Sequence, residues 1–407
     1  KISEDTDCIF FFFFLDGDQD LYVASGGNEF PSTSSALIDR LYLNNGKGNL
    51  VRAQGPFIGM RFESTSCVQA EDYDKDGDLD LFVGVRLKPF LYGIPVNGYI
   101  LNNDGKGRFT NVTEEVAPSL IEAGMITDAL WLDLDQDDDK DLVVAGEWMP
   151  IKILMNEGGK LVDATEKAGL TGSNGFWNCI KAGDFDGDGD LDLIAGNHGL
   201  NTRFKASAEH PVTMHTNDFD GNGTAEQIVS VFNGDGSYPL ALRHDLIAQM
   251  PVLKRKYLKY ESYKNQRVED IFSPEQLERA VKMEIYMTET SLLINDGKGK
   301  FEIKPLPLEA QFSPVYGINV EDFNHDGKLD ILMGGNFHRA KPEVGIYDAN
   351  YGLFLQGKGD GSFRILTPYE SGFFTVGEVR DLVTIKGNGK DYVLVGKNDD
   401  KLQIFEY

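Results

Sequence analysis

The chain has 407 residues, of which 41% are hydrophobic and 11% aromatic, enough for a packed core and too many for a disordered chain. Its 65 acidic and 39 basic residues give a net charge of −26, which repels phosphate backbones and anionic membranes and argues against nucleic acid as a partner. The longest apolar run, Ile9 to Leu15, has the length of a strand and not of a transmembrane segment. Since the chain starts at Lys1 without Met and without a signal peptide, we expect that the true N-terminus was removed.

In chain order, the first predicted strand pair encloses a degenerate acidic loop. It reads Phe12-Phe-Phe-Leu-Asp16-Gly-Asp-Gln-Asp20 and leads into Leu-Tyr-Val. Phe12 and Phe14 stand at two positions that carry Asp or Asn in the later copies, so only Asp16 and Asp20 remain as ligands. We predict no ion at this loop.

Five complete copies of the nine-residue acidic loop follow, each leading into a short apolar run that reads as a buried strand. The side chains at positions 1, 3, 5 and 9 and the main-chain carbonyl at position 7 can turn toward one centre, and glycine at position 6 permits the sharp bend. Loop by loop, the predicted ligand positions are Asp72, Asp74, Asp76, Asp78 and Asp80; Asp133, Asp135, Asp137, Asp139 and Asp141; Asp184, Asp186, Asp188, Asp190 and Asp192; Asp218, Asp220, Asn222, Thr224 and Glu226; and Asp322, Asn324, Asp326, Lys328 and Asp330.

Six or seven oxygen ligands around one centre suit Ca²⁺, because Mg²⁺ keeps its waters and Zn²⁺ prefers His or Cys. Solvated acidic turns are the alternative, but carboxylates held so close would repel one another without a cation. Asp138 stands where glycine is expected, and Asn222, Glu226 and Asn324 are still oxygen donors. We predict about five calcium sites. Extracellular sites of this kind bind calcium at about 0.1 to 1 mM, so we expect the protein to work outside the cytoplasm.

Glycine turns at 44–48, 102–107, 295–299 and 357–361 lie between apolar runs and read as hairpins. Strand, acidic loop, strand, strand, glycine turn and strand make one four-stranded blade. We therefore predict an all-β fold, a seven-bladed β-propeller that spans 1–407 as one domain. Six blades is the alternative, because the 34 residues from Asp184 to Asp218 are too few for a whole blade. The chain stops near the end of a third strand, so we expect Ile2 to Glu4 to supply the closing outer strand.

Segment 238–286 does not fit the repeat, and we predict a helical insertion in blade five on the face opposite the calcium loops. Ala241 to Met250 and Gln276 to Ile285 read as helices, the second opened by a capping box that starts at Ser273. Lysines at 254, 256, 259 and 264 interleave with tyrosines at 257, 260 and 263. This pattern suits a lid, a dock for an anionic partner, or a buttress whose lysines face water.

The three cysteines, Cys8, Cys67 and Cys179, occupy related positions before acidic loops. Their odd number argues against a disulfide framework, and we expect packed residues in equivalent strands and not catalytic thiols.

The turns that follow the second strands should emerge on the other face, around a central channel. Aromatic, amide, acidic and guanidinium groups there would suit a sugar or peptide ligand, although ordinary polar loops are the alternative. The candidates are Glu29, Arg86, Glu147, Trp148, Asn197, His198, Asn201, Arg203, Asn336, His338 and Arg339. Trp148 and Trp177 suit blade packing equally well.

Motifs of the common enzyme families, such as HExxH, GxSxG and the P-loop, do not occur in the sequence. We therefore expect a non-catalytic, calcium-stabilised propeller for extracytoplasmic recognition of a glycan or protein ligand, or for scaffolding. A polysaccharide lyase is the alternative function, with His198, His338, Arg203 and Arg339 as candidate base and charge-neutralising groups.

The acidic loops and glycine turns resemble FG-GAP or VCBS repeats, the calcium-binding blades of integrin-α-type propellers, over nearly the whole chain. The chain looks similar to propeller regions of exported bacterial proteins that accompany an ASPIC/UnbV segment. The resemblance implies sevenfold closure, a cell-envelope setting (periplasm, cell surface or secreted), a place in a larger envelope protein, and a binding or scaffolding role. Some such relatives carry a nucleic-acid-binding description, which the charge of this chain argues against.

Overall fold

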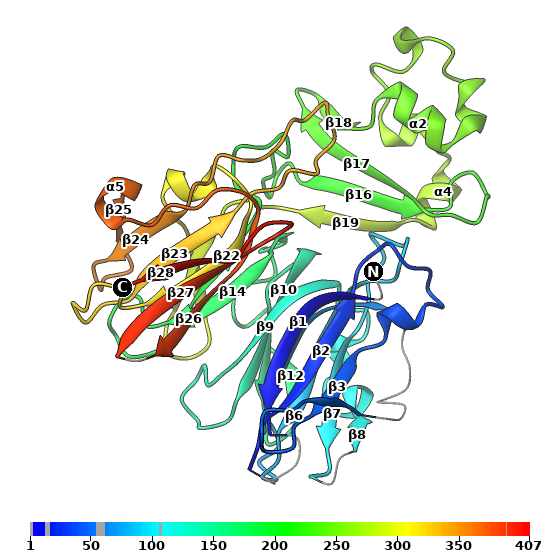
Figure 1. Ribbon diagram of the computed structural model, residues 1–407. Coiled ribbons are helices and arrows are strands. Elements are labelled where there is room, and N and C mark those ends of the chain that lie inside the picture. The colour runs from blue at the N-terminus through cyan, green and yellow to red at the C-terminus, as the bar shows by residue number, and fades with distance from the viewer. Residues whose placement is uncertain (1–2, 13–16, 54–61, 106–107, 388) are drawn as a thin grey trace.

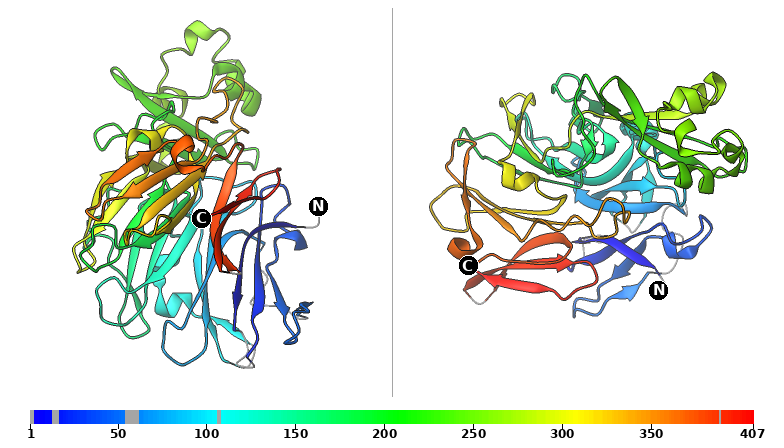
Figure 2. Two further views of the ribbon diagram at one scale, coloured as in Figure 1. Left: turned by 60° about the vertical axis from the view of Figure 1, so that its left-hand side comes forward. Right: turned by 90° about the horizontal axis from the view of Figure 1, so that it is seen from above.

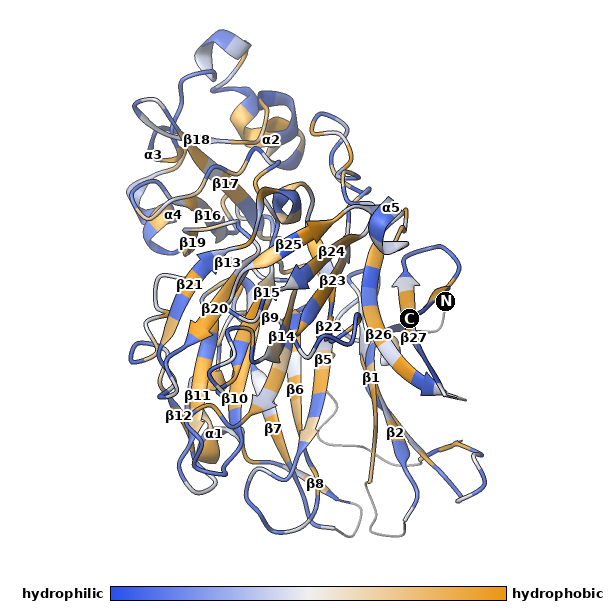
Figure 3. Cartoon of the chain, turned by 90° about the vertical axis from the view of Figure 1, so that its left-hand side faces the viewer, coloured by the Kyte–Doolittle hydropathy of each residue, from blue (hydrophilic) through white to orange (hydrophobic). Residues whose placement is uncertain are grey.

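The computed structural model describes residues 3–12, 17–53, 62–105, 108–387 and 389–407 (Figure 1). Within these ranges the strands form seven antiparallel sheets, so the prediction of an all-β fold is confirmed. No helix in the described ranges is long and apolar enough to cross a membrane. The strands are rich in apolar residues and the connecting loops are mostly polar (Figure 3).

The first three sheets follow the predicted order of four strands along the chain. They contain β1 (Glu4–Phe11), β2 (Asp20–Gly26), β3 (Arg40–Leu43) and β4 (Val51–Arg52); β5 (Ser64–Glu71), β6 (Asp80–Leu87), β7 (Gly98–Asn103) and β8 (Phe109–Asn111); and β9 (Met125–Leu132), β10 (Asp141–Met149), β11 (Lys152–Asn156) and β12 (Leu161–Asp163), with β13 (Gly175–Phe176) paired to the end of β10.

The fourth, fifth and sixth sheets complete this series. They contain β14 (Cys179–Gly183), β15 (Asp192–Gly196), β20 (Ser291–Asn295) and β21 (Phe301–Pro305); β22 (Val315–Glu321), β23 (Asp330–Gly335), β24 (Leu353–Gly357) and β25 (Phe363–Leu366); and β26 (Val379–Gly387), β27 (Lys390–Lys397) and β28 (Gln403–Glu406). In the second, fourth and fifth sheets the acidic loop joins the first two strands and the glycine turn joins the last two, as predicted.

The six sheets stand side by side with their first strands innermost, and an apolar cluster fills each interface from the first sheet to the sixth (Figure 2). A polar side chain on the first strand, or just before it, also donates to the backbone of the next sheet. Thr6 donates to the carbonyl of Thr65 at 2.8 Å, and Ser66 donates to that of Ile126 at 2.7 Å. Figure 2 shows the first and last sheets next to each other.

The seventh sheet corrects the prediction of seven successive blades. It has the order β18 (Gly236–Pro239), β17 (Glu226–Asn233), β16 (Val212–Asn217) and β19 (Val281–Ile285), and it lies in the chain between β15 and β20. Leu193 of β15 pairs with Leu293 of β20, so the outer strands of the fourth sheet come after this inserted sheet. The short interval before Asp218 arises because the fourth sheet is interrupted there. The inserted sheet is therefore not the fifth in the series.

The segment between β18 and β19 is helical, as predicted, but its helices are shorter than those predicted. It contains α2 (Arg243–Gln249), η3 (Pro251–Lys254), η4 (Tyr260–Ser262), α3 (Val268–Ile271) and α4 (Pro274–Glu278). The capping box at Ser273 is present, but the predicted helix ends at Glu278 and Val281 to Ile285 form an edge strand. Short helices elsewhere are η1 (Ser35–Leu37), α1 (Thr113–Val116), η2 (Pro118–Leu120), η5 (Leu308–Gln311) and α5 (Pro368–Ser371).

The inserted segment has an apolar core of its own. Tyr257 and Tyr263 are buried in it beside Leu246 and Phe272, whereas Tyr260 stays exposed. β15 begins at the acidic loop and ends at Gly196, so the chain leaves the fourth sheet for this segment at the end opposite that loop (Figure 1).

The termini and cysteines complete the comparison with the sequence. Glu4 begins β1, an innermost strand, so it does not close an outer edge as predicted, while Ile2 lies outside the described residues. Cys67 and Cys179 are buried in the innermost strands β5 and β14, and Cys8 lies in the corresponding strand β1 but is exposed.

Candidate functional site

The acidic loops bring carboxylates from positions 1, 3 and 9 together. In four loops, one oxygen from each of these three side chains lies within 4.8 Å of the other two: Asp72, Asp74 and Asp80; Asp133, Asp135 and Asp141; Asp184, Asp186 and Asp192; and Asp218, Asp220 and Glu226. In the fifth loop Asn324 takes position 3 between Asp322 and Asp330. The degenerate loop at Phe12 to Asp20 lies partly outside the described residues. In each of the four clusters the position 9 residue is buried and the other two are at least partly exposed, and the clusters could bind metal ions.

The position 1 carboxylate shapes each loop by accepting main-chain amides. Asp322 accepts from Asp326 at 3.0 Å and from Gly327 at 2.8 Å, and Asp72 accepts from Asp76 and Gly77 at 3.1 Å each. These bonds from a side chain to amides four and five residues further along hold the turn, so the sequence of the loop fixes its own turn.

Position 6 needs a left-handed backbone in every loop. Its φ is 98° at Gly77, 94° at Gly189 and 71° at Asp138, the one loop without glycine there. Asp tolerates this conformation at a cost of about 1 kcal/mol, so Asp138 keeps the turn.

The position 9 carboxylate ties the loop to the rest of its sheet. One oxygen of Asp192 accepts the amide of Phe185 at 3.0 Å, and the other accepts the amide of Asn295, in the third strand, at 2.8 Å. Asp80 and Asp330 likewise accept from Asn103 and Gly357.

Some of the cluster oxygens are buried and have no hydrogen-bond partner among the described residues. They are Asp80 Oδ2 and Asp330 Oδ2 at position 9 and Asp186 Oδ1 at position 3. A buried carboxylate oxygen without a donor costs free energy unless a cation is bound to it. The orphaned oxygens therefore fit a hard cation such as Ca²⁺.

The carboxylate at position 5 is directed at the main chain of its own loop. Its oxygen accepts the amide of position 7, as in Asp137 to Asp139 at 2.9 Å and Asp188 to Asp190 at 3.1 Å. The predicted ligand at this position therefore lies in the loop but outside the three-residue clusters. Asp139 also forms an ion pair with Lys75 of the preceding loop.

The glycine turns lock neighbouring loops together. Asn156 ends β11, just before the glycines at 158 and 159. Its side-chain amide donates to the carbonyl of Lys140, in the acidic loop of the same sheet, at 3.1 Å, and to that of Tyr73, in the acidic loop of the preceding sheet, at 2.7 Å. Asn295 repeats this arrangement with Leu191 and Leu134. Each of these asparagines therefore fixes two loops at once.

The electrostatics of the clusters favour a bound cation. Burial raises the pKa of Asp80 to about 8, and the negative charges of Asp74 and Asp78 raise it further. The hydrogen bond from the Asn103 amide acts in the opposite direction and lowers this pKa. Burial also raises the pKa of Asp141, Asp192 and Asp330 to about 6. Without a counter-ion the charged forms are therefore destabilised in the folded protein.

At the opposite end of the sheets, the structure joins three of the predicted ligand residues. Arg86, in β6, donates to both carboxylate oxygens of Glu147, in β10, at 2.7 and 3.3 Å. Tyr92 donates to Glu147 at 3.0 Å and accepts from the indole nitrogen of Trp148 at 3.0 Å. Glu147 and Trp148 are buried, whereas 45% of the Arg86 side chain is exposed.

A second group lies close to this one and was missed from the sequence. The guanidinium of Arg380 lies 4.3 Å from the centre of the Tyr316 ring and donates to Glu378 at 2.9 Å. Burial raises the pKa of Tyr316 to about 12, and the charges that act on it include Arg380, Glu147 and Arg86. Arg86, Glu147, Tyr316, Glu378 and Arg380 are hereafter called the mouth cluster.

The signal for the missed residues was available in the sequence. The strands are antiparallel, so the end of each second strand and the start of each first strand lie at the same end of a sheet. Tyr316 and Arg380 stand near the starts of the first strands β22 and β26, whereas the predicted ligand residues were chosen from turns that follow second strands.

The other predicted ligand residues mostly serve the fold. Asn197 and Asn336 are buried and hydrogen-bonded to the main chain, and Asn201 donates to the carbonyl of Phe312. Arg339 pairs with Asp399 at 2.9 Å, and the main-chain amide of His338 donates to Glu378. Glu29 and Arg203 are exposed.

His198 and the tryptophans lie in packed surroundings. The His198 ring contacts Phe176, Phe204 and Tyr347 at centroid distances of 5.0 to 5.5 Å, and burial lowers its pKa to about 4. Trp177 is fully buried and donates to the carbonyl of Ser173. Trp148 and Trp177 are therefore packing residues.

The family described as FG-GAP-like repeat matches residues 13–83 and 133–195. These two segments contain the acidic loops that start at Asp72, Asp133 and Asp184. The chain carries FG-GAP-like repeats. The predicted resemblance to FG-GAP repeats is thereby confirmed within these two segments. No curated protein matches the chain.

Among solved structures, the chain is similar to an Agrocybe aegerita protein described as recognising non-reducing terminal N-acetylglucosamine, with 16% identity, a TM-score of 0.33 and coverage of 88% of this chain and 79% of that one. It is similar to the V. cholerae biofilm matrix protein Bap1, with 9% identity, a TM-score of 0.36 and coverage of 95% and 73%. It is also similar to BBS1N crystallised in complex with ARL6DN, with 11% identity, a TM-score of 0.36 and coverage of 99% and 92%.

Proposed function

We propose that the protein is a non-catalytic, calcium-stabilised β-propeller of six blades that recognises a glycan or protein ligand outside the cytoplasm. The observation that carries this proposal is the division of the sheets into two ends. One end holds the acidic clusters with their orphaned carboxylate oxygens, and the other holds the mouth cluster.

Calcium at the acidic loops would act on the fold and not on a substrate. Each cluster connects two strands, and the asparagines of the glycine turns link it to the next loop. An ion that neutralises the carboxylates of positions 1, 3 and 9 would stabilise each sheet and the contact between sheets. A requirement for millimolar calcium fits a protein exposed to extracellular fluid.

The mouth cluster suits recognition because it offers charge and hydrogen-bonding groups held in place by one another. Arg86 is half exposed while Glu147 fixes its guanidinium from behind, and the aromatic face of Tyr316 lies against Arg380. Guanidinium groups and aromatic rings that are already ordered lose little conformational entropy when a sugar or peptide binds. Scaffolding without a ligand at this face is the simpler alternative.

The test is a glycan array on the calcium-loaded protein, compared with the Arg380→Gln variant. Glu378 keeps its bonds from Asn398 and the His338 amide in this variant, so folding should persist. We expect at least tenfold weaker binding of any glycan hit, with Arg52→Gln in the outer strand β4 as the matched control.

The same experiment separates the alternatives. A calcium-stabilised protein without a glycan hit would favour a protein partner or a scaffold. A separate assay tests the polysaccharide lyase considered above: uronate polymers incubated with the protein would yield an ultraviolet-absorbing product, and that result would overturn the non-catalytic proposal.

A further inference from the structure

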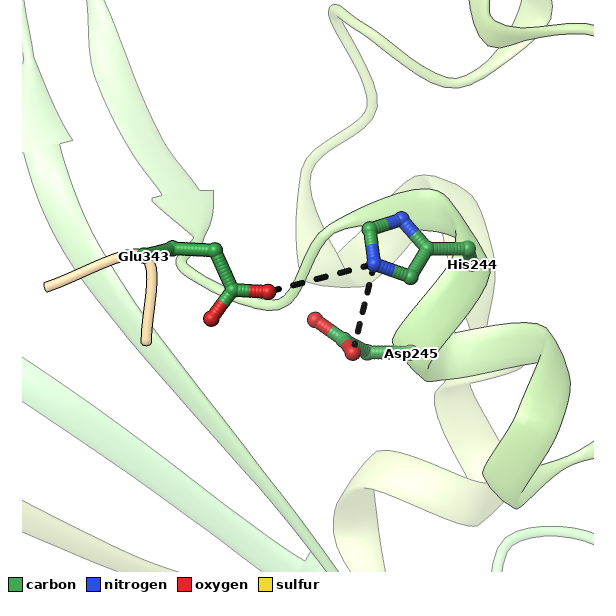
Figure 4. Close-up of side chains that lie close together, drawn as sticks. All are labelled: His244, Asp245 and Glu343. Carbon is green, nitrogen blue, oxygen red and sulfur yellow. Dashed lines mark ion pairs between the residues drawn. The ribbon is translucent and has the colours of Figure 1, made fainter. Parts of the chain in front are cut away.

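Three potential metal ligands meet where the inserted segment faces a loop of the fifth sheet. His244 and Asp245 lie in α2, and Glu343 lies between β23 and β24, about a hundred residues further along the chain. The Nε2 atom of His244 is 3.6 Å from Asp245 Oδ1 and 4.0 Å from Glu343 Oε1 (Figure 4). All three ligand atoms lie within 4.8 Å of one another.

Two of these side chains, His244 and Asp245, also have a partner on the side away from the cluster. The other ring nitrogen of His244, Nδ1, is 2.6 Å from the hydroxyl oxygen of Tyr260, in η4. The other oxygen of Asp245, Oδ2, is 3.2 Å from the Nζ of Lys341. With Nδ1 protonated and donating to Tyr260, Nε2 presents its lone pair toward the two carboxylates. Such outer partners orient the ligands of a metal ion and fix the histidine tautomer.

The spacing and the ligand types favour zinc over calcium. Two ligands at about 2.05 Å from a tetrahedral Zn²⁺ lie about 3.4 Å apart, close to the distances observed here. An imidazole nitrogen with two carboxylate oxygens is a common ligand set for Zn²⁺ and an unusual one for Ca²⁺, which prefers oxygen alone. The side chains of His244 and Glu343 are exposed, so a dissolved ion can reach them.

We propose that His244, Asp245 and Glu343 bind one Zn²⁺, with a water as the fourth ligand, and that this ion holds the inserted segment against the loop between β23 and β24. The two carboxylates neutralise the charge of the ion, while Lys341 and Tyr260 keep the ligands oriented. This site is separate from the acidic loops in position and in ligand chemistry, and it does not depend on the proposed recognition function.

The test is titration of the intact protein with zinc chloride by calorimetry in millimolar calcium, which competes with zinc for the acidic loops. We expect one zinc ion per chain, and at least tenfold weaker binding in His244→Ala and in Glu343→Gln. His210→Ala and Glu309→Gln, outside the cluster, are the matched controls and should bind zinc as the parent protein does. Tyr260→Phe should weaken zinc binding less than His244→Ala, since it removes only an outer partner.

Cobalt chloride provides a second readout that reports geometry. A tetrahedral site gives Co²⁺ an intense visible absorption band, and this band should disappear in His244→Ala and Glu343→Gln. Unchanged zinc affinity in both variants, or the absence of zinc binding to the parent protein, would overturn the proposal. Equal calcium-dependent melting temperatures for all variants would show that they are folded.

Discussion

The acidic loops that start at Asp184 and Asp218 share their first four residues but lie in different surroundings. The first belongs to the fourth sheet of the series, and the second belongs to the inserted sheet. In both loops the position 1 carboxylate accepts two amides, and the position 9 carboxylate accepts the amide of the phenylalanine at position 2. The loop sequence thus determines the turn wherever it occurs.

What braces the two loops differs. The carbonyl of Phe185 accepts the amide of Gly361, from the glycine turn of the next sheet, at 2.9 Å. The carbonyl of Phe219 accepts instead the side-chain amide of Gln276, in α4, at 2.6 Å, and the Phe219 ring stacks on Phe272 at 4.0 Å. The helical segment therefore replaces the neighbouring sheet as a support. The comparison teaches that a repeat motif specifies a turn and its ligands, while its position in the fold decides what the ligands hold together.

Calcium removal should have the largest effect and should reach both loops. With each site at about ten times its Kd, bound calcium adds about 1.4 kcal/mol per site, or about 7 kcal/mol for five sites. We expect a chelator to lower the melting temperature strongly, measured by circular dichroism for the whole chain. The three tryptophans lie in or next to the third and fourth sheets, and Trp148 also packs against β16 and β19, so their fluorescence reports the series of sheets together with its contact to the inserted sheet. An unchanged melting temperature would contradict the assignment of the loops to calcium.

The pH dependence of the calcium-free protein should be the next largest effect. The folded-state pKa of Asp80 is about 8 and that of Asp192 about 6, whereas both have an ordinary value of 3.8. At a pH between the ordinary value and the raised value, the folded state therefore binds more protons than the unfolded state. Stability should therefore fall, by a few kcal/mol, as the pH rises from about 4 to about 8. Denaturant unfolding in chelator at several pH values measures this change. Calcium should abolish or reverse the trend, and a flat profile in chelator would argue against the raised pKa values.

Asp192→Asn should destabilise the calcium-loaded protein more than Glu226→Gln. Asp192 holds its own loop and, through Asn295, the outer strands of the fourth sheet, whereas Glu226 accepts from Phe219 within its loop. We expect losses of about 2 to 3 kcal/mol and about 1 kcal/mol respectively, from urea unfolding in millimolar calcium. Equal losses would mean that the bracing by the third strand contributes nothing.

Asp138→Gly should give the smallest effect and the opposite sign. Asp138 has a φ of 71° where the other four loops have glycine, and the change removes both the backbone strain and one acidic charge. We expect a gain of about 0.5 to 1 kcal/mol in the free energy of unfolding. Asp139→Gly, which removes a neighbouring acid that pairs with Lys75, is the control and should not stabilise the protein.

The loop chemistry and the strand order within a sheet could be predicted because they are local. Positions 1, 3 and 9 converge as the spacing indicated, and the glycine turns join the strands that they were expected to join. The wrong prediction was that the sheet with the Asp218 loop is the fifth blade of the series, and it arose because the pairing that decides this is not local. The Asp218 loop has the complete motif, and no short-range signal shows that Leu193 pairs with Leu293 across the intervening segment.

The candidate recognition face was harder to predict, since its residues come from different sheets. Arg86 and Glu147 were singled out separately, but their ion pair depends on how the second and third sheets lie together. Tyr316 and Arg380 were missed because they lie at the starts of first strands and do not follow second strands. Asn197 and Asn336 were chosen for their chemistry, yet their amides satisfy buried main-chain groups.

The interrupted fourth sheet also bears on how the chain is made. Asp192 and its partner Asn295 are 103 residues apart, so a ribosome adding about 5 to 20 residues per second completes the second of them about 5 to 20 s after the first. During that interval the fourth sheet consists of β14 and β15 alone, because β20 and β21 have not yet been made. The inserted sheet and its helices can already form from consecutive residues. The order of synthesis thus favours a nascent chain in which the insertion folds before the sheet that carries it.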